Sequence, residues 1–191
     1  VELEIVEQFL PPTLIINEVD YDSVGTDKSE WVELFNPGDE AFSLAGVRLY
    51  LINGSNNSVY GTIVLGEGQV PAQGYLLVHG KEYVAPESCA VAVPFGGAQD
   101  QIQNGAPDAL ALIAADNTLL DGLGYEGCKD PVAIPDVGSF DLCIGGASPA
   151  GVDSNTEEGS LARLPNGQRT GSNAADFAFT TKLTPCADNL P

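Results

Sequence analysis

The 191-residue sequence contains no methionine and one histidine, and its 7 Lys and Arg residues are set against 27 Asp and Glu residues. The formal net charge is −20 at pH 7. Phosphate backbones and anionic lipid surfaces bind proteins mainly through clustered Lys and Arg. The chain has no such cluster, and Arg163 and Arg169 are its nearest arginine pair. Nucleic acids and membrane surfaces are therefore poor candidate partners, whereas cations, basic proteins or a salty environment suit the charge better. The simplest interpretation of the charge is a soluble, non-adhesive surface.

Long apolar runs are absent as well. No segment approaches the ~20 apolar residues that a bilayer-spanning helix requires, so we expect no membrane insertion. The hydrophobic fraction of 43% is enough to fill the core of one domain. Because neither an initiator methionine nor a signal peptide stands at Val1, we interpret the chain as a mature or trimmed product. We also expect it to be a monomeric module of a larger protein.

The four cysteines form no C-x-x-C pair, so the spacing typical of zinc ligands is missing. An even number of widely spaced cysteines in an acidic, loop-rich chain indicates two disulfides and an oxidising, extracytoplasmic compartment. Three connectivities are compatible with the sequence. We favour Cys128–Cys143, because it closes a local loop, which leaves Cys89–Cys186 to fasten the tail to the body. The alternative is four buried free thiols in a cytoplasmic protein.

No long helical period appears, and 22 Gly and 13 Pro separate short apolar or alternating runs. Such runs, bounded by turn residues, are typical of a β-sandwich or barrel. The run Val47–Asn53 alternates in a way that predicts one buried face and one mixed face. The predicted strands are Thr13–Asp20, Glu30–Asn36, Val47–Asn53, Val59–Leu65, Tyr75–Gly80, Cys89–Pro94, Ala109–Ala115 and Thr118–Tyr125.

The predicted organisation is one domain with an extension and an insertion. Residues 1–12 end in Pro11-Pro12 and read as a linker or N-terminal extension, and residues 13–191 as the domain. Residues 127–159 are rich in Gly, Pro, Asp and Ser and are too long for an ordinary connection. We interpret them as an inserted loop braced by Cys128–Cys143, and as the first place to look for functional contacts.

The segment Leu14–Asn36, which reads LIINEVDYDSVGTDKSEWVELFN, closely resembles the opening of a lamin tail domain. Further similar pieces follow in the family's order along the chain, up to Asn189. They are Ile16–Glu18, Glu30–Pro37, Leu44–Val47, Val70–Val78, Asp108–Leu112, Leu120–Tyr125, Ser160–Arg163 and Thr184-Pro185. The resemblance implies an immunoglobulin-like β-sandwich with long loops, which binds or tethers and is not known for catalysis.

Three features depart from the family. Cys186 stands where bacterial members usually carry glycine, which supports a disulfide peculiar to this chain. The family does not predict a role for the 127–159 insertion. Nucleic-acid contacts proposed for nuclear lamin tails do not carry over to so acidic a surface. Bacterial relatives typically occur in exported or surface proteins, often beside hydrolase domains, so the resemblance implies a secreted or cell-surface location.

The sequence offers weak catalytic candidates. Gly146-Ala147-Ser148-Pro149-Ala150 lacks the last glycine of G-x-S-x-G and its strand–turn–helix context. The one imidazole, His79, ends a predicted strand, where a half-buried structural role is the more common one. We therefore expect no enzyme activity and assign no catalytic residue.

A cluster of carboxylates follows the first predicted strand. Asp20, Asp22, Asp27 and Glu30 lie near one another in sequence, with Gly25 supplying a bend. Calcium accepts six to eight oxygen ligands in flexible loops, so one hypothesis is that these four residues bind Ca²⁺. The spacing is not that of an EF-hand, and the alternative, which we favour, is that they are solvated turn residues that cap backbone N–H groups.

The predicted function is that of a non-catalytic extracellular binding or tethering module, whose partner is a protein or a polysaccharide of the cell surface. One alternative is a metal-dependent hydrolase, or a hydrolase accessory domain, that acts on phosphorylated substrates; a single histidine makes this difficult. A second alternative is an acidic structural domain of a salt-adapted surface protein.

Overall fold

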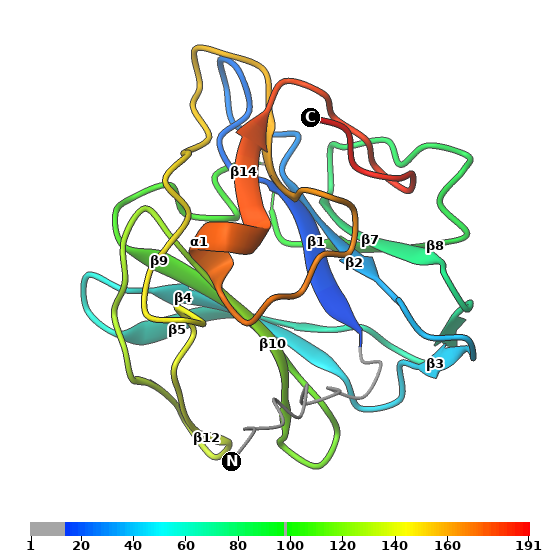
Figure 1. Ribbon diagram of the computed structural model, residues 1–191, viewed down its shortest axis with the longest axis horizontal. Helices are drawn as coiled ribbons and strands as arrows, with labels where there is room; N and C mark the ends of the chain where they lie inside the picture. The colour runs from blue at the N-terminus through cyan, green and yellow to red at the C-terminus, as the bar shows by residue number, and fades with distance from the viewer. Residues whose placement is uncertain (1–13, 98) are drawn as a thin grey trace, which may run out of the picture.

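The structure is a computed structural model that describes residues 14–97 and 99–191, and it is almost entirely β-sheet (Figure 1). One sheet has six strands in the order β14 (Phe177–Thr180), β13 (Ser160–Arg163), β1 (Ile15–Asp20), β2 (Trp31–Phe35), β7 (Tyr75–Gly80) and β8 (Val91–Phe95). The other has the order β10 (Leu119–Tyr125), β9 (Asp108–Ile113), β4 (Arg48–Asn53) and β5 (Ser58–Val64). Two short pairs, β3 (Phe42–Ser43) with β6 (Gln69–Val70) and β11 (Val132–Ile134) with β12 (Gly138–Phe140), and one helical turn, α1 (Asn173–Asp176), complete the fold.

The predicted immunoglobulin-like β-sandwich is confirmed. Each of the eight strands predicted from the sequence has an observed counterpart within a few residues, from β1 to β10. Neighbouring strands pair antiparallel except β7 and β8, which run parallel. The predicted linker at residues 1–12 lies outside the described residues, so the division of the chain at that point stays a prediction.

The main core lies between the two sheets. Alternate residues of β1, β2 and β7 on one side, and of β4, β9 and β10 on the other, form one cluster of buried apolar side chains. Leu34 and Leu76 from the six-stranded sheet belong to the same cluster as Leu49 and Leu112 from the four-stranded sheet. Because side chains of a strand alternate between its two faces, the period of two seen in the sequence fills this space.

The outer face of the four-stranded sheet is buried as well. Tyr50 and Ile52 of β4 pack with Val132 and Ile134 of β11 in a second apolar cluster. The insertion therefore covers this sheet as an additional layer, and Figure 1 shows the segment that carries β12 running along that side of the molecule. The prediction of a mixed face for Val47–Asn53 was wrong in this respect, since the insertion, far away in sequence, hides that face from solvent.

The outer face of the six-stranded sheet has its own cover. Trp31 and Leu77 form a third apolar cluster with Cys186, and Cys89 packs against it. A disulfide joins Cys89 to Cys186 over this face, and a second joins Cys128 to Cys143 in the insertion. These are the two pairs favoured from the sequence. Each disulfide thus fastens a loop segment that covers the outside of one sheet.

The insertion approaches β10 so closely that it leaves no room for a side chain at one position and little room at a second. A Cβ atom on Gly124 would lie 2.3 Å from the Cys143 sulfur, and one on Gly122 would lie 3.0 Å from Leu142. The Gly124 N–H donates to the Leu142 carbonyl at 3.0 Å. The absence of side chains at these positions lets the insertion continue the pairing at the edge of β10.

Candidate functional site

The four acidic residues proposed for calcium extend from Asp20, the last residue of β1, to Glu30, which directly precedes β2, and three of them are buried. Asp20, Asp27 and Glu30 are 5%, 7% and 1% exposed. The Ser23 N–H donates to Asp27 at 3.0 Å, and the Gln101 N–H donates to Glu30 at 2.8 Å. These two carboxylates therefore organise the backbone of neighbouring loops.

Asp22 accepts hydrogen bonds from two other loops. One of its oxygens accepts a hydrogen bond from the Asn104 side chain at 2.9 Å and the other from the Asn155 N–H at 3.0 Å. Within residues 14–97 and 99–191, no three Asp, Glu, His or Cys side chains form a group that could hold a metal ion. The structure thus does not bring the four predicted ligands together, and the calcium hypothesis stays untested.

Asp20 stands out among these residues by what surrounds it. Its Oδ1 atom is buried without a hydrogen-bond partner in the described structure. Burial, followed by the charges of Asp153, Asp27, Glu158 and Glu30, raises the pKa of Asp20 to about 9. Removing a carboxylate from water and surrounding it with like charges both favour its neutral form. Both effects favour the protonated form of Asp20 in the folded chain.

Asp153, which reaches Asp20 from the insertion, is by contrast fully engaged. Its Oδ2 accepts the N–H groups of Tyr21 and Asp22 at 2.9 and 3.1 Å. The Tyr21 hydroxyl donates no bond to that carboxylate; instead the Asp153 N–H donates to the hydroxyl at 2.8 Å. Burial raises the pKa of Asp153 to about 7. These contacts fasten the end of the insertion to the end of β1.

A second set of buried carboxylates connects the chain's last residues to the six-stranded sheet. Glu18 and Glu33 are register partners on β1 and β2 and are both fully buried. Glu18 accepts hydrogen bonds from Ser160 at 2.6 Å and from the Thr184 hydroxyl at 2.9 Å. Glu33 accepts the Cys186 N–H at 2.5 Å, and burial raises its pKa to about 8. These polar groups position the tail, so we assign them a structural role.

The described residues contain one buried network of opposite charges. Arg163 is 1% exposed and forms ion pairs with Asp121 at 2.8 Å and with Asp176 at 3.0 Å. Its Nε also donates to the Ile16 carbonyl at 2.6 Å. Because a buried guanidinium requires partners for its charge and its N–H groups, this network joins β1, β10, β13 and α1 at fixed positions.

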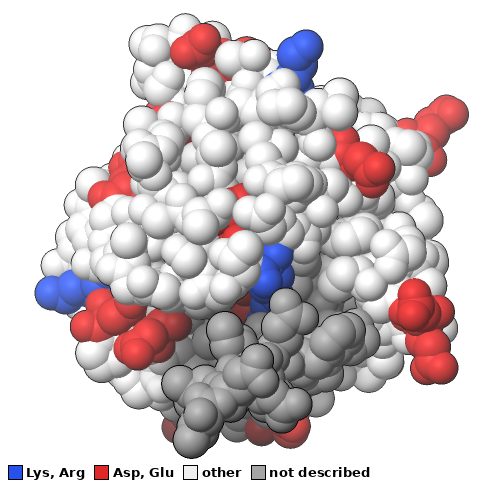
Figure 2. Space-filling model, viewed as in Figure 1, with Lys and Arg blue, Asp and Glu red and all other residues white. Residues whose placement is uncertain are grey.

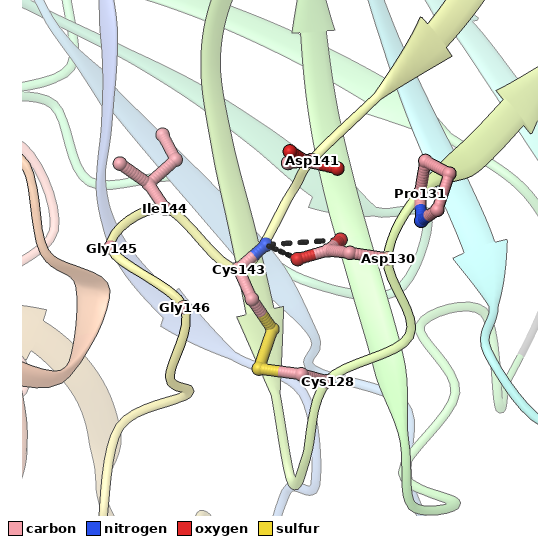
Figure 3. Close-up of a pocket in the computed structure, with 8 residues that line it drawn as sticks. All are labelled: Cys128, Asp130, Pro131, Asp141, Cys143, Ile144, Gly145 and Gly146. Atoms are coloured by element: carbon pink, nitrogen blue, oxygen red, sulfur yellow. Dashed lines mark hydrogen bonds between the residues drawn. A yellow bond between two sulfur atoms is a disulfide. The ribbon is translucent and has the colours of Figure 1, made fainter.

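A surface pocket lies in the insertion, with a volume of about 630 Å³ (Figure 3). The Cys128–Cys143 disulfide forms part of its wall, and Pro131 and Ile144 add apolar surface. Gly145 and Gly146 also line it, and both have positive φ, 82° and 81°. The insertion therefore builds a concave surface whose backbone is fixed at one side by a covalent link.

Two carboxylates line this pocket, and they differ in what they contact. Asp130 accepts hydrogen bonds from the N–H groups of Leu142 and Cys143 at 2.8 and 3.1 Å, so it is held in place, as the dashed lines in Figure 3 show for Cys143. Asp141 is exposed, and within the described structure its carboxylate has no hydrogen bond or ion pair. The pocket thus presents one fixed and one free carboxylate and no basic side chain.

The remaining surface favours no other kind of site. The large exposed apolar side chains of the described residues are all aliphatic: Val24, Val64, Val84, Val152 and Leu190. Figure 2 shows Asp and Glu side chains at several separate places on one face, with few Lys or Arg. His79 is 9% exposed and its Nδ1 lies 2.9 Å from the Gly80 carbonyl, which fits the structural role expected of it. A second, smaller pocket of about 310 Å³ follows β2, lined by residues that include Asp39 and Glu40.

Sequence reasoning singled out residues 127–159 as an insertion, which stays a prediction, but it did not identify the pocket residues within them. Asp130 and Asp141 carried no motif, and only the Cys128–Cys143 link hinted that the two halves of the loop meet. Asp153 was missed as a partner of the acidic turn, because the sequence separation of more than a hundred residues hides their contact. In the described part of the chain, no helix is long and apolar enough to cross a membrane.

Comparison with known proteins gives one family. The family model described as Lamin Tail Domain matches residues 8–127. A search of curated proteins gives no significant match to the chain. The family match ends where the insertion begins, yet β13 and β14, beyond it, pair beside β1 and complete the six-stranded sheet.

Proposed function

The chain belongs to the lamin tail domain family, whose immunoglobulin-like domains are generally non-catalytic, and from this premise we propose that it is an extracellular binding or tethering module for a cell-surface protein. The observation that carries the proposal is the disulfide-braced pocket in residues 127–159. The family match ends at residue 127, and the residues that line the pocket lie beyond it. Loops added to a rigid sandwich are where binding residues are found most often.

The two disulfides support a location outside the cytoplasm. Structural disulfides form and persist in oxidising compartments and are rare where thiol reductants are abundant. Here they join Cys89 to Cys186 and Cys128 to Cys143. The first lies in the apolar cluster that covers the outer face of the six-stranded sheet, and the second closes the loop whose Val132, Ile134 and Leu142 cover the four-stranded sheet.

A protein suits the surface better than a polysaccharide. Carbohydrate recognition commonly uses exposed aromatic faces, whereas the large exposed apolar side chains of the described residues are all aliphatic. A net charge of −20 attracts basic protein surfaces and accelerates their association. These features favour a partner that presents Lys and Arg.

Binding of the labelled chain to isolated envelopes of the cells that produce it tests the proposal. We expect saturable binding that disappears after the envelopes are treated with protease and survives treatment with glycosidases. Binding that survives protease but not glycosidase would replace the protein with a polysaccharide, and no saturable binding would refute the module. Assays for phosphodiesterase and phosphatase activity with calcium, magnesium or manganese should show none.

A further inference from the structure

The pocket in the insertion has the composition of a site for a positively charged side chain. Two of its lining side chains are carboxylates, Asp130 and Asp141, and none is Lys, Arg or His. The carboxylates are available to different degrees. Asp130 is occupied by backbone N–H groups of Leu142 and Cys143, whereas Asp141 is exposed and has no polar partner within the described structure. A cation entering the pocket would therefore meet one carboxylate that is free to bind it and a second that adds negative potential.

The walls fit the rest of a long basic side chain. Pro131 and Ile144 line the pocket beside the carboxylates, and Ile144 is half-buried. Lys and Arg pack their methylene stems along apolar surface while the charged end remains near polar groups or water. A neutral polar ligand could donate a hydrogen bond to Asp141 but would leave its charge uncompensated, and an anion would be repelled by both carboxylates and by the net charge of −20.

The geometry is held before any partner arrives. Cys128 and Cys143 are joined by a disulfide, and Cys143 lies against Gly124 of β10, where a side chain would collide with its sulfur. Asn173 of α1 holds the next residue, because its Oδ1 accepts the Ile144 N–H at 2.7 Å. A preformed site loses less conformational entropy on binding than a flexible loop does.

We propose that this pocket binds a Lys or Arg side chain of the partner protein, with Asp141 as its ion-pair partner and Asp130 as the fixed second carboxylate. The inference rests on the proposed function, since it names the chemical group by which the surface partner is recognised. It deepens that function by assigning the contact to individual residues of the insertion.

Small probes test the pocket without knowledge of the partner. The amide signals of the ¹⁵N-labelled full chain are followed while Nα-acetyl-lysine N-methylamide or its arginine analogue is added, with the norleucine analogue as the uncharged control. We expect saturable shifts confined to the amides of residues 128–146, lost in Asp141→Asn and retained in Asp136→Asn. Asp136 is an exposed residue of the same insertion that does not line the pocket, so it controls for the change in net charge.

Three results of the probe experiment would overturn the inference. They are equal shifts with norleucine, shifts spread over the whole acidic surface, and unchanged shifts in Asp141→Asn. Envelope binding separates this inference from the proposed function. If Asp141→Asn lowers envelope affinity about fivefold, the factor that ~1 kcal/mol of ion-pair energy gives, and Asp136→Asn does not, the inference holds. If the parent binds envelopes and Asp141→Asn binds equally well, the pocket assignment fails while the module stands.

Discussion

Replacement of Asp20 by asparagine should stabilise the protein, although it alters a buried residue of β1. The carboxyl group is 5% exposed, and its Oδ1 has no hydrogen-bond partner in the described structure. Asp153, Asp27, Glu158 and Glu30 all act on it as like charges. Asparagine is nearly the same size, carries no charge, and has an NH₂ group that donates hydrogen bonds where the carboxylate can only accept them. The substitution therefore removes a cost of folding without creating a cavity.

The size of the effect follows from the pKa of Asp20, which burial and like charges raise from an ordinary 3.8 to about 9. At pH 7 the unfolded chain ionises this group, whereas the folded chain must keep its proton. Each pH unit between 3.8 and 7 contributes about 1.4 kcal/mol, so the free energy of unfolding should rise by up to about 4 kcal/mol in Asp20→Asn. For a domain of this size that corresponds to roughly 10 °C in Tm.

The difference in stability between the parent and Asp20→Asn should grow as the pH rises. An acid whose folded pKa is raised contributes no cost below its unfolded pKa, and its cost grows as the pH rises toward the folded pKa. The parent should therefore lose stability relative to Asp20→Asn between about pH 4 and pH 9. The two proteins should be nearly equal in stability at pH 4, and the difference should level off above pH 9.

Urea unfolding followed by the fluorescence of Trp31, the single tryptophan and fully buried, measures this difference at pH 4, 7 and 9. The exposed Asp39→Asn serves as the matched control for loss of one negative charge. A stability of Asp20→Asn equal to or below the parent at pH 7 would refute the reasoning. So would a parent that is stabilised by millimolar calcium while Asp20→Asn is not, since an ion rather than a proton would then neutralise the cluster.

Three further predictions concern the tail, the insertion and the two disulfides. Burial raises the pKa of Glu33 from 4.5 to about 8, so the free energy of unfolding of the parent should fall by at most about 5 kcal/mol as the pH rises from 4.5 to 8. This fall should be smaller in Glu33→Gln and unchanged in the exposed control Glu67→Gln. Urea unfolding at pH 5 and 8 measures it. Gly124→Ala should lower the free energy of unfolding by about 1–3 kcal/mol, because its methyl group would collide with the Cys143 sulfur. A thermal melt with the same Tm as the parent would contradict this close approach. Removal of the Cys89–Cys186 disulfide by a double serine substitution should cost about 4–5 kcal/mol of stability, and removal of Cys128–Cys143 about 3 kcal/mol. The first should cost more because it closes a longer loop of the unfolded chain, with a sequence separation of 97 against 15. The reverse order in urea unfolding would show that chain entropy does not decide these contributions.

The sandwich could be predicted because its information is local. Short runs of alternating or apolar residues between Gly, Pro, Asn and Asp specify strands wherever they lie, and Ile15–Asp20 and Tyr75–Gly80 appear almost where the sequence placed them. The family motifs add the order of the strands. The cysteine spacing also made one local pair the favoured one, since Cys128 and Cys143 enclose a single loop.

The candidate sites depended on contacts that sequence spacing does not encode. Asp20, Asp22, Asp27 and Glu30 look alike as neighbours in the chain, yet each strand or loop turns its carboxylate toward a different partner. Asp22 meets Asn155, and Glu30 meets the Gln101 N–H. Only Asp20 is left buried with an oxygen that has no donor in the described structure, a result of where the end of the insertion packs.

The sequence by itself determined the β-strands and the acidic charge, because composition and the period of two act over a few residues. The tertiary structure alone decided what the insertion does: it covers the face of β4 that carries Tyr50 and Ile52, and it brings Asp130 and Asp141 to one pocket. Burial and pocket shape are sums over residues far apart in the chain, so they exist only once the two sheets and their covers have packed together.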